Sequence, residues 1–186
     1  MSTVTERMTA DRFLAIGDEL PRFSQLIDGE VVVNEPSARH QDLAGYLYRG
    51  LADWADRQPG RGKAWLPLDV RLAEHQVYAP DVLWLAESHL PPRDAAHLVG
   101  PPDLVVEVRS ASTWRYDLGT KKAVYERRGL PELWLVDSAA DTVLVYRRSH
   151  PDAEEFDVAL EVGASQTLAS PLLPGFAVDV SELFDR

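Results

Sequence analysis

Cysteine is absent from this chain of 186 residues, which excludes disulfides and thiolate metal sites. Long apolar runs are missing too, since nowhere do about 18 consecutive apolar residues appear, the length that a membrane-spanning helix needs. The first residues, Met1 to Arg7, lack the apolar core of a secretion signal. We therefore expect a cytoplasmic protein with no membrane partner.

Positive charge is also scarce, because 19 lysines and arginines face 30 aspartates and glutamates, for a net charge of -11. This balance argues against a protein that coats nucleic acid non-specifically, since such binding depends on basic residues that neutralise phosphates. Between Glu107 and Arg128, however, six basic residues face only three acidic ones. This segment is compatible with a local nucleic-acid site, although charge alone equally fits a solvated helix face.

Length and composition predict one domain over residues 1–186. The chain is 45% hydrophobic, enough for one substantial core, and too short for two ordinary domains. In the first third, capping residues, a turn dipeptide and apolar spacing predict three features. These are a short helix that begins at Thr9, a hairpin through Asp28-Gly29, and a long amphipathic helix from Pro36-Ser37 to about Arg57.

The rest of the chain alternates between strand-like and helical patterns. Strands are predicted over 65–72, 77–85, 103–109, 133–136, 142–146 and 156–162, with a surface loop over 87–102. A helix over 117–128, ended by Gly129, joins the strands at 103–109 and 133–136. Strand, helix and strand in this order favour parallel pairing of the two strands. The fold class is therefore α/β or α+β, with a mixed β-sheet flanked by helices.

Two carboxylates stand among apolar residues, where they are costly to desolvate. Asp81 follows a proline and precedes Val82 to Leu85, and Glu107 lies between two valines. Each needs a cation, a metal ion or several hydrogen-bond donors. The alternative is structural: Asp81 caps a turn, and Glu107 pairs with Arg109 or Arg115.

Helical spacing places Lys121 on the apolar side of its helix, together with Leu118 and Tyr125. An inward lysine needs an anion, and the nearest candidate is Glu107 on the preceding strand. The alternative is that Lys121 extends outward to solvent. Asp117 lies one turn earlier, where it can either hold Lys121 or cap the helix, and Lys122 lies toward the helix edge.

Four segments in order, Pro80-Asp81, 103–110, 117–125 and 129–137, resemble the Uma-two family of restriction-endonuclease-like proteins, as do the flanks at 26–30, His40 and 173–176. The resemblance implies a PD-(D/E)XK nuclease core that hydrolyses nucleic acid, above all DNA. It also implies that Asp81 and Glu107 bind Mg²⁺ or Mn²⁺ and that Lys121 helps to activate the attacking water.

Supporting or substrate-binding roles fall to Gln25, His40, Arg109, Asp117 and Lys122. For His40, which lies in the amphipathic helix, an ordinary surface or packing role is the alternative. Two positions depart from the family pattern: Arg109 stands two residues after Glu107, where the simplest motif has lysine, and Gln25 stands where a glutamate is usual. A neutral amide weakens an anionic metal site, which leaves two alternatives open. One is a catalytically inactive nuclease-fold module that binds nucleic acid, and the other is a protein-interaction domain. A homodimer is one way for a small nuclease to cut both strands.

Overall fold

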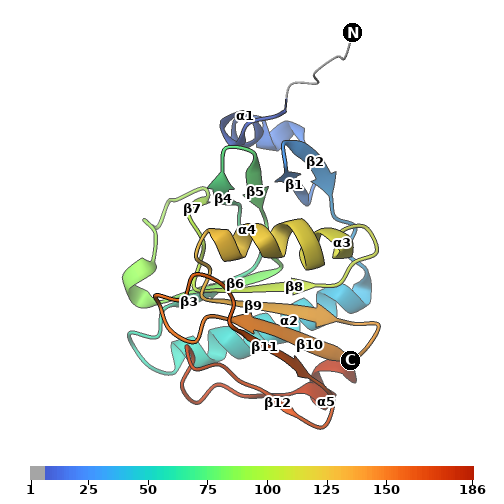
Figure 1. Ribbon diagram of the computed structural model, residues 1–186, viewed down its shortest axis with the longest axis vertical. Helices are drawn as coiled ribbons and strands as arrows, with labels where there is room; N and C mark the ends of the chain where they lie inside the picture. The colour runs from blue at the N-terminus through green and yellow to red at the C-terminus, as the bar shows by residue number, and fades with distance from the viewer. Residues whose placement is uncertain (1–6) are drawn as a thin grey trace.

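The computed structural model describes residues 7–186. Two larger β-sheets and a small two-stranded sheet combine with helices in a mixed α/β arrangement (Figure 1). The helices are α1 (Ala10–Ala15), α2 (Ala38–Asp56), α3 (Trp114–Tyr116), α4 (Lys122–Arg127) and α5 (Val180–Phe184), with short 3-10 helices η1 (Gly17–Glu19) and η2 (Glu87–His89) and a π-helix η3 (Asp117–Lys121). The strands are β1 (Ser24–Ile27), β2 (Glu30–Val33), β3 (Lys63–Trp65), β4 (Val70–Ala73), β5 (Gln76–Tyr78), β6 (Val82–Leu85), β7 (Leu98–Val99), β8 (Leu104–Val108), β9 (Glu132–Asp137), β10 (Thr142–Arg147), β11 (Val158–Val162), β12 (Thr167–Leu168) and β13 (Val178–Asp179).

The six-stranded sheet has the order β11-β10-β9-β8-β6-β3 and holds the buried centre of the fold. Strands β8 and β9 pair in parallel, as the strand-helix-strand pattern predicts, whereas the other pairs in this sheet are antiparallel. All five residues of β8 are buried, so this strand reads as a nearly continuous apolar run with Glu107 inside it.

Helices cover both faces of this sheet. On one face α2 contributes Leu43, Leu47 and Leu51 to a core that also contains Val106 and Trp134. On the other face α4 packs Val124 and Tyr125 against alternate residues of the same strands, including Leu83, Val105 and Leu133. Because side chains alternate along a strand, Glu107 shares the α4 face with Val105.

The five-stranded sheet, order β2-β1-β5-β4-β7, packs beside α4 and is covered on its outer side by α1 (Figure 1). Its hairpin turns at Asp28 and Gly29, both with positive φ, as the Asp-Gly dipeptide predicts. The short helix also begins as predicted, because the Thr9 side chain accepts a hydrogen bond from the backbone of Arg12. Likewise, Ser37 caps the long helix α2.

Two predicted strands and one predicted helix are wrong in detail. The runs 65–72 and 77–85 each divide into two strands that belong to different sheets, because the chain crosses from one sheet to the other at Leu66–Asp69 and again at Ala79–Asp81. The predicted surface loop at 87–102 contains η2 and the short strand β7. The helix expected at 117–128 starts at Trp114 and contains a π turn, which leaves Leu118 exposed by 43% instead of facing inward.

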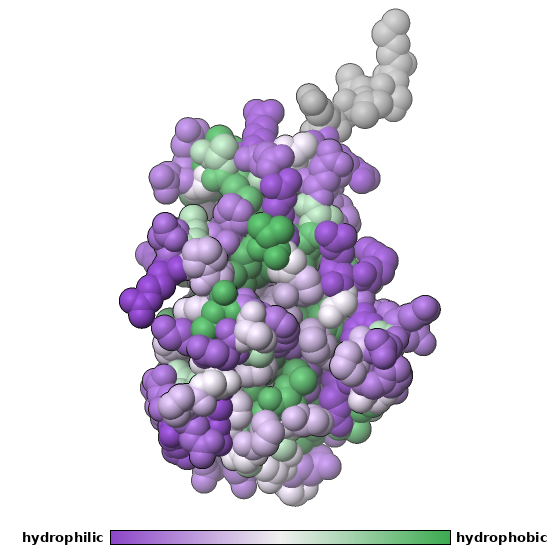
Figure 2. Space-filling model, turned by 90° about the vertical axis from the view of Figure 1, so that its left-hand side faces the viewer, coloured by the Kyte–Doolittle hydropathy of each residue, from purple (hydrophilic) through white to green (hydrophobic). Residues whose placement is uncertain are grey.

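The face shown in Figure 2 is mainly hydrophilic, with apolar side chains in separate small groups. None of the helices within residues 7–186 has both the length and the apolar character needed to cross a membrane.

Alanine substitution at two glycines, one in the hairpin turn and one in α2, tests the assignment of these two elements. Gly29→Ala is expected to destabilise the protein by more than about 1 kcal/mol, because Gly29 has φ +81° and an added Cβ would lie 2.6 Å from Cβ of Arg7. Gly45→Ala, inside α2 with open space around it, should stabilise by about 0.5–1 kcal/mol. Urea unfolding measures both; changes of the same sign would contradict the assignment of the turn and the helix.

Candidate active site

The pairing of β6 with β8 brings Asp81 and Glu107 to the same part of the sheet. Val82 lies opposite Val106, so continuing the antiparallel register by one residue places Asp81 opposite Glu107. The backbone N–H of Val108 donates a 2.7 Å hydrogen bond to Oδ2 of Asp81. Both residues are buried: the exposed fraction is 7% for Asp81 and 3% for Glu107.

Lys121 extends inward from the end of the π turn and meets two carboxylates. Its Nζ lies 2.7 Å from Oε1 of Glu107 and 2.8 Å from Oδ1 of Asp117. In a π turn one winding takes more residues than in an α-helix, so Asp117, and not Leu118, shares the inner face with Lys121. The lysine is 1% exposed and therefore does not extend outward to solvent.

Tyr125 is a site residue that the sequence reasoning missed. Its hydroxyl donates a 2.8 Å hydrogen bond to Oε1 of Glu107, the same oxygen that faces Lys121. The Tyr125 hydroxyl and the Lys121 ammonium thus converge on the same oxygen of Glu107. Tyr125 lies four residues after Lys121, and a hydroxyl at this inward position was the only signal in the sequence.

Asp117 is held from its other side by a short chain of hydroxyl groups. Thr113 donates a 3.3 Å hydrogen bond to Oδ2 of Asp117, and the hydroxyls of Thr113 and Ser110 lie 2.7 Å apart. Sequence reasoning missed both residues, because small hydroxyl residues in a connecting segment carry no distinctive pattern. Their effect is to keep Asp117 within reach of Lys121.

Two buried carboxyl groups contact Lys121 and a third, Asp81, lies near them, so this cluster of Asp81, Glu107, Asp117 and Lys121 has more acidic than basic groups. Burial raises the pKa of Glu107 to about 8, an effect that Lys121 partly offsets and that the neighbouring Asp117 and Asp81 reinforce. Burial also raises the pKa of Asp117. Burial lowers the pKa of Lys121, but Asp117 and Glu107 together raise it above its ordinary value. Lys121 is therefore a cation at neutral pH.

His40 and Gln25 approach the cluster from two other elements. His40, in the first turn of α2, is 3% exposed, and its Nε2 lies 3.1 Å from Oδ2 of Asp81. Gln25 on β1 accepts a 3.2 Å hydrogen bond from the backbone N–H of Ala79, two residues before Asp81. Gln25 thus fixes the chain that leads into Asp81.

Arg109 and Lys122 lie outside the cluster. Arg109 pairs with Asp137 at 2.9 Å and stacks over Trp114, so the alternative in which Glu107 pairs with Arg109 or Arg115 is wrong. Lys122 lies over the rings of Tyr146 and Phe156, 4.5 and 5.7 Å from their centroids. Both cations are available to the surface and not to the buried carboxylates.

The donor set that could hold a metal ion is small. Within residues 7–186, no three histidine, aspartate or glutamate side chains are grouped closely enough to form a complete metal site. A cation bound between Asp81 and Glu107 would therefore take further ligands from water or from a substrate. Mg²⁺ commonly binds in this way, through one or two carboxylates, several waters and substrate phosphates.

Comparison with known proteins places the chain in a family. The model of the Uma2 family, described as "Putative restriction endonuclease", matches residues 10–181. The chain belongs to the Uma2 family. A crystal structure from Anabaena variabilis ATCC 29413, described as "a putative nuclease belonging to DUF820", has the same fold as this Uma2 protein, with a TM-score of 0.78 and 19% sequence identity. The similarity covers 96% of this chain and 98% of the other. A search of curated proteins found no match.

Removing the buried lysine of this Uma2 protein should be costly. Lys121→Met is expected to destabilise it by about 3–5 kcal/mol at pH 7, because Glu107 and Asp117 lose the cation between them. Lys122→Met is the matched control and should change stability by no more than about 1 kcal/mol, since only cation–π contacts are lost. Urea unfolding in EDTA measures both; equally small losses would contradict the buried ion pairs.

The raised pKa of Glu107 predicts how stability depends on pH. In EDTA, the free energy of unfolding should fall as pH rises from about 4.5 toward about 8, because the unfolded chain releases a proton that folded Glu107 retains. Glu107→Gln should remove this part of the pH dependence. Unfolding measured at a series of pH values checks it, and parallel profiles of parent and variant would show that Glu107 titrates normally.

Proposed function

We propose that this protein is a metal-dependent endonuclease that hydrolyses phosphodiester bonds of DNA, with Mg²⁺ or Mn²⁺ as its cofactor. The observation that carries the proposal is the buried cluster itself, in which Lys121 meets Glu107 and the register of β6 with β8 brings Asp81 beside Glu107. Membership of the Uma2 family supports the same reaction class. Asp81, Glu107 and Lys121 are the proposed catalytic residues.

The residues fit a hard divalent cation. Asp81 and Glu107 supply oxygen ligands, and the raised pKa of Glu107 reflects burial and nearby carboxylates that a cation would stabilise. When bound, the metal ion would supply Lewis-acid stabilisation of the phosphate and a more acidic water molecule. Tyr125 and Lys121 would keep one oxygen of Glu107 occupied, which leaves its other oxygen for the metal.

Lys121 acts in this proposal as a cation and not as a base. Its pKa is raised, so it keeps its proton at neutral pH and cannot take one from water. A fixed ammonium beside the scissile phosphate would instead donate hydrogen bonds to the attacking water or to the developing negative charge. Asp117 is a positioning residue, because it holds Nζ of Lys121 at 2.8 Å.

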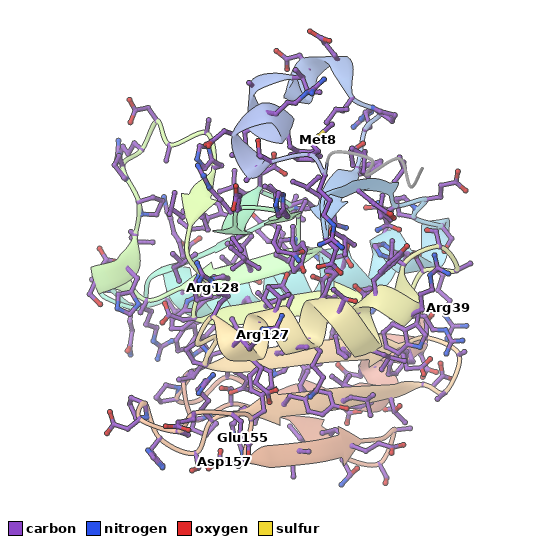
Figure 3. All side chains as sticks on the ribbon, turned by 45° about the horizontal axis from the view of Figure 1, so that its top comes forward. Met8, Arg39, Arg127, Arg128, Glu155 and Asp157 are labelled. Carbon is purple, nitrogen blue, oxygen red and sulfur yellow. The ribbon has the colours of Figure 1, made fainter. Side chains whose placement is uncertain are left out.

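Phosphate contacts are assigned to arginines around the turn between β9 and β10. Arg39 pairs with Asp141, and Arg109 pairs with Asp137, both in partly exposed ion pairs. Such pairs contribute at most about 1 kcal/mol, so a DNA phosphate can replace the aspartate. In Figure 3, Arg39 lies near α3, whereas Arg127 and Arg128 lie toward the opposite end of α4. Because the protein as a whole is acidic, DNA binding would depend on these few arginines. Cutting both strands would require two copies of the protein, as in a homodimer.

One observation favours a second candidate, a nuclease-fold module without catalytic activity. The cluster is closed, because Asp81, Glu107, Asp117 and Lys121 are each 7% exposed or less. Gln25, at 3% exposure, also lacks the charge that a glutamate would add. Such a module would bind nucleic acid or a protein without cleaving either.

Metal titration and plasmid nicking together separate these functions. Calorimetry should detect Mn²⁺ binding to the parent, and Asp81→Asn and Glu107→Gln should weaken binding and reduce nicking by at least about 100-fold. Glu161→Gln, an exposed position on β11, is the control and should behave like the parent.

Each other outcome has a distinct meaning. Metal binding without cleavage would support the inactive module, whereas cleavage that survives both substitutions would show that the active site lies elsewhere. No metal binding and no cleavage by the parent would overturn the proposed function.

A further inference from the structure

Phe23, directly before β1, has an unusual backbone conformation. Its φ is +62°, in the left-handed region that bulky side chains rarely adopt. The backbone N–H of Asn34 donates a 3.0 Å hydrogen bond to the carbonyl oxygen of Phe23, and the β1–β2 ladder begins at the next residue. The hairpin therefore holds Phe23 in a strained conformation that glycine would adopt without cost. Strain retained in this way is frequent at ligand sites.

The ring of Phe23 gains little from folding in return for this strain. The residue is 41% exposed, and the guanidinium of Arg22 lies 5.3 Å from its ring centroid. An exposed aromatic ring beside an arginine can stack against a nucleobase while the arginine contacts the adjoining phosphate.

A cavity of about 550 Å³ opens beside this ring, a volume within the range of small-molecule sites. Its lining joins the segment around Phe23 to the two chain crossings between the sheets, which contribute Leu68 and Ala79. Asp18 and Asp69 also line the cavity and would repel a phosphate inside it. Their carboxylates can accept hydrogen bonds from the amino groups of a base, so the cavity suits an uncharged nucleobase better than an anion.

The cavity is connected to the proposed active site through the chain. Ala79 in its lining precedes Asp81 by two residues, about 7 Å of extended chain. Gln25, two residues after Phe23, binds the backbone of Ala79 and so connects the two segments directly.

We infer that Phe23 and Arg22 form a stacking platform for one unpaired base of a nucleic-acid substrate, at the start of the segments that lead into the proposed active site. The base would lie on the Phe23 ring over the cavity, and Arg22 would contact its phosphate. This inference rests on the proposed function, because it assigns the substrate of that site: a strand with at least one unstacked base.

Binding of a single-stranded DNA oligonucleotide that carries 2-aminopurine tests the platform in EDTA, where no cleavage is expected. Fluorescence anisotropy should show binding by the parent, and Phe23→Ala should weaken it by about 5- to 150-fold, the range for loss of one stacked base. Phe23→Trp should keep the affinity. Leu160→Ala, at a 46% exposed position on β11, is the matched control and should bind like the parent.

Phe23→Gly separates lost stacking from misfolding. Glycine relieves the strained φ, so this variant should melt at least as high as the parent while it binds the oligonucleotide as weakly as Phe23→Ala. Quenching of 2-aminopurine by the parent, and its loss in both variants, would identify stacking as the cause.

The outcomes distinguish the platform from the nuclease. Cleavage that does not depend on Phe23, together with unchanged binding by Phe23→Ala, overturns the platform alone. Phe23-dependent binding by a protein that never cleaves supports the platform and overturns the nuclease. Failure of the parent to bind the oligonucleotide overturns the platform, and in that case this surface would suit an apolar side chain of a protein partner.

Discussion

The contacts of Lys121 with Glu107 and Asp117 hold the site together. A lysine that is 1% exposed is stable only where polar groups replace its water, and here two carboxyl groups do so at 2.7 and 2.8 Å. The π turn sets which residues face inward, and the parallel β8–β9 pair fixes the strand that carries Glu107. The position of Lys121 therefore depends on the π turn, on β8 and on the two carboxyl groups together.

Local pattern was sufficient to predict the parts of the fold that local physics decides. The Asp-Gly turn, the Ser37 cap and the buried strand that contains Glu107 each have a strong sequence signal. An inward Lys121 followed from helical spacing, and its contact with Glu107 followed from the need for a counter-ion. Local pattern did not predict that residues 65–85 are divided between two sheets. Sheet membership depends on distant partners, which the alternation of apolar and polar residues does not encode.

The remaining features of the site could not be predicted from the regular spacing of apolar residues. A π turn differs from an α-helix by one residue per winding, which exchanged Leu118 for Asp117 on the inner face. The positive φ of Phe23 is imposed by the hairpin that follows it and contradicts the preference of the residue itself. The approach of His40 to Asp81 joins a helix to a residue 41 positions further along the chain, directly before β6, and no local pattern specifies it.

Crystals grown with Mn²⁺ would show whether Asp81 and Glu107 hold a metal ion, because the anomalous signal of manganese locates the ion without reference to activity. We expect one strong peak bound by carboxylate oxygens of both Asp81 and Glu107, about 2.0–2.6 Å from each, with Lys121 still facing Glu107. A peak elsewhere in the molecule, or none at a Mn²⁺ concentration that supports cleavage, would contradict this expectation.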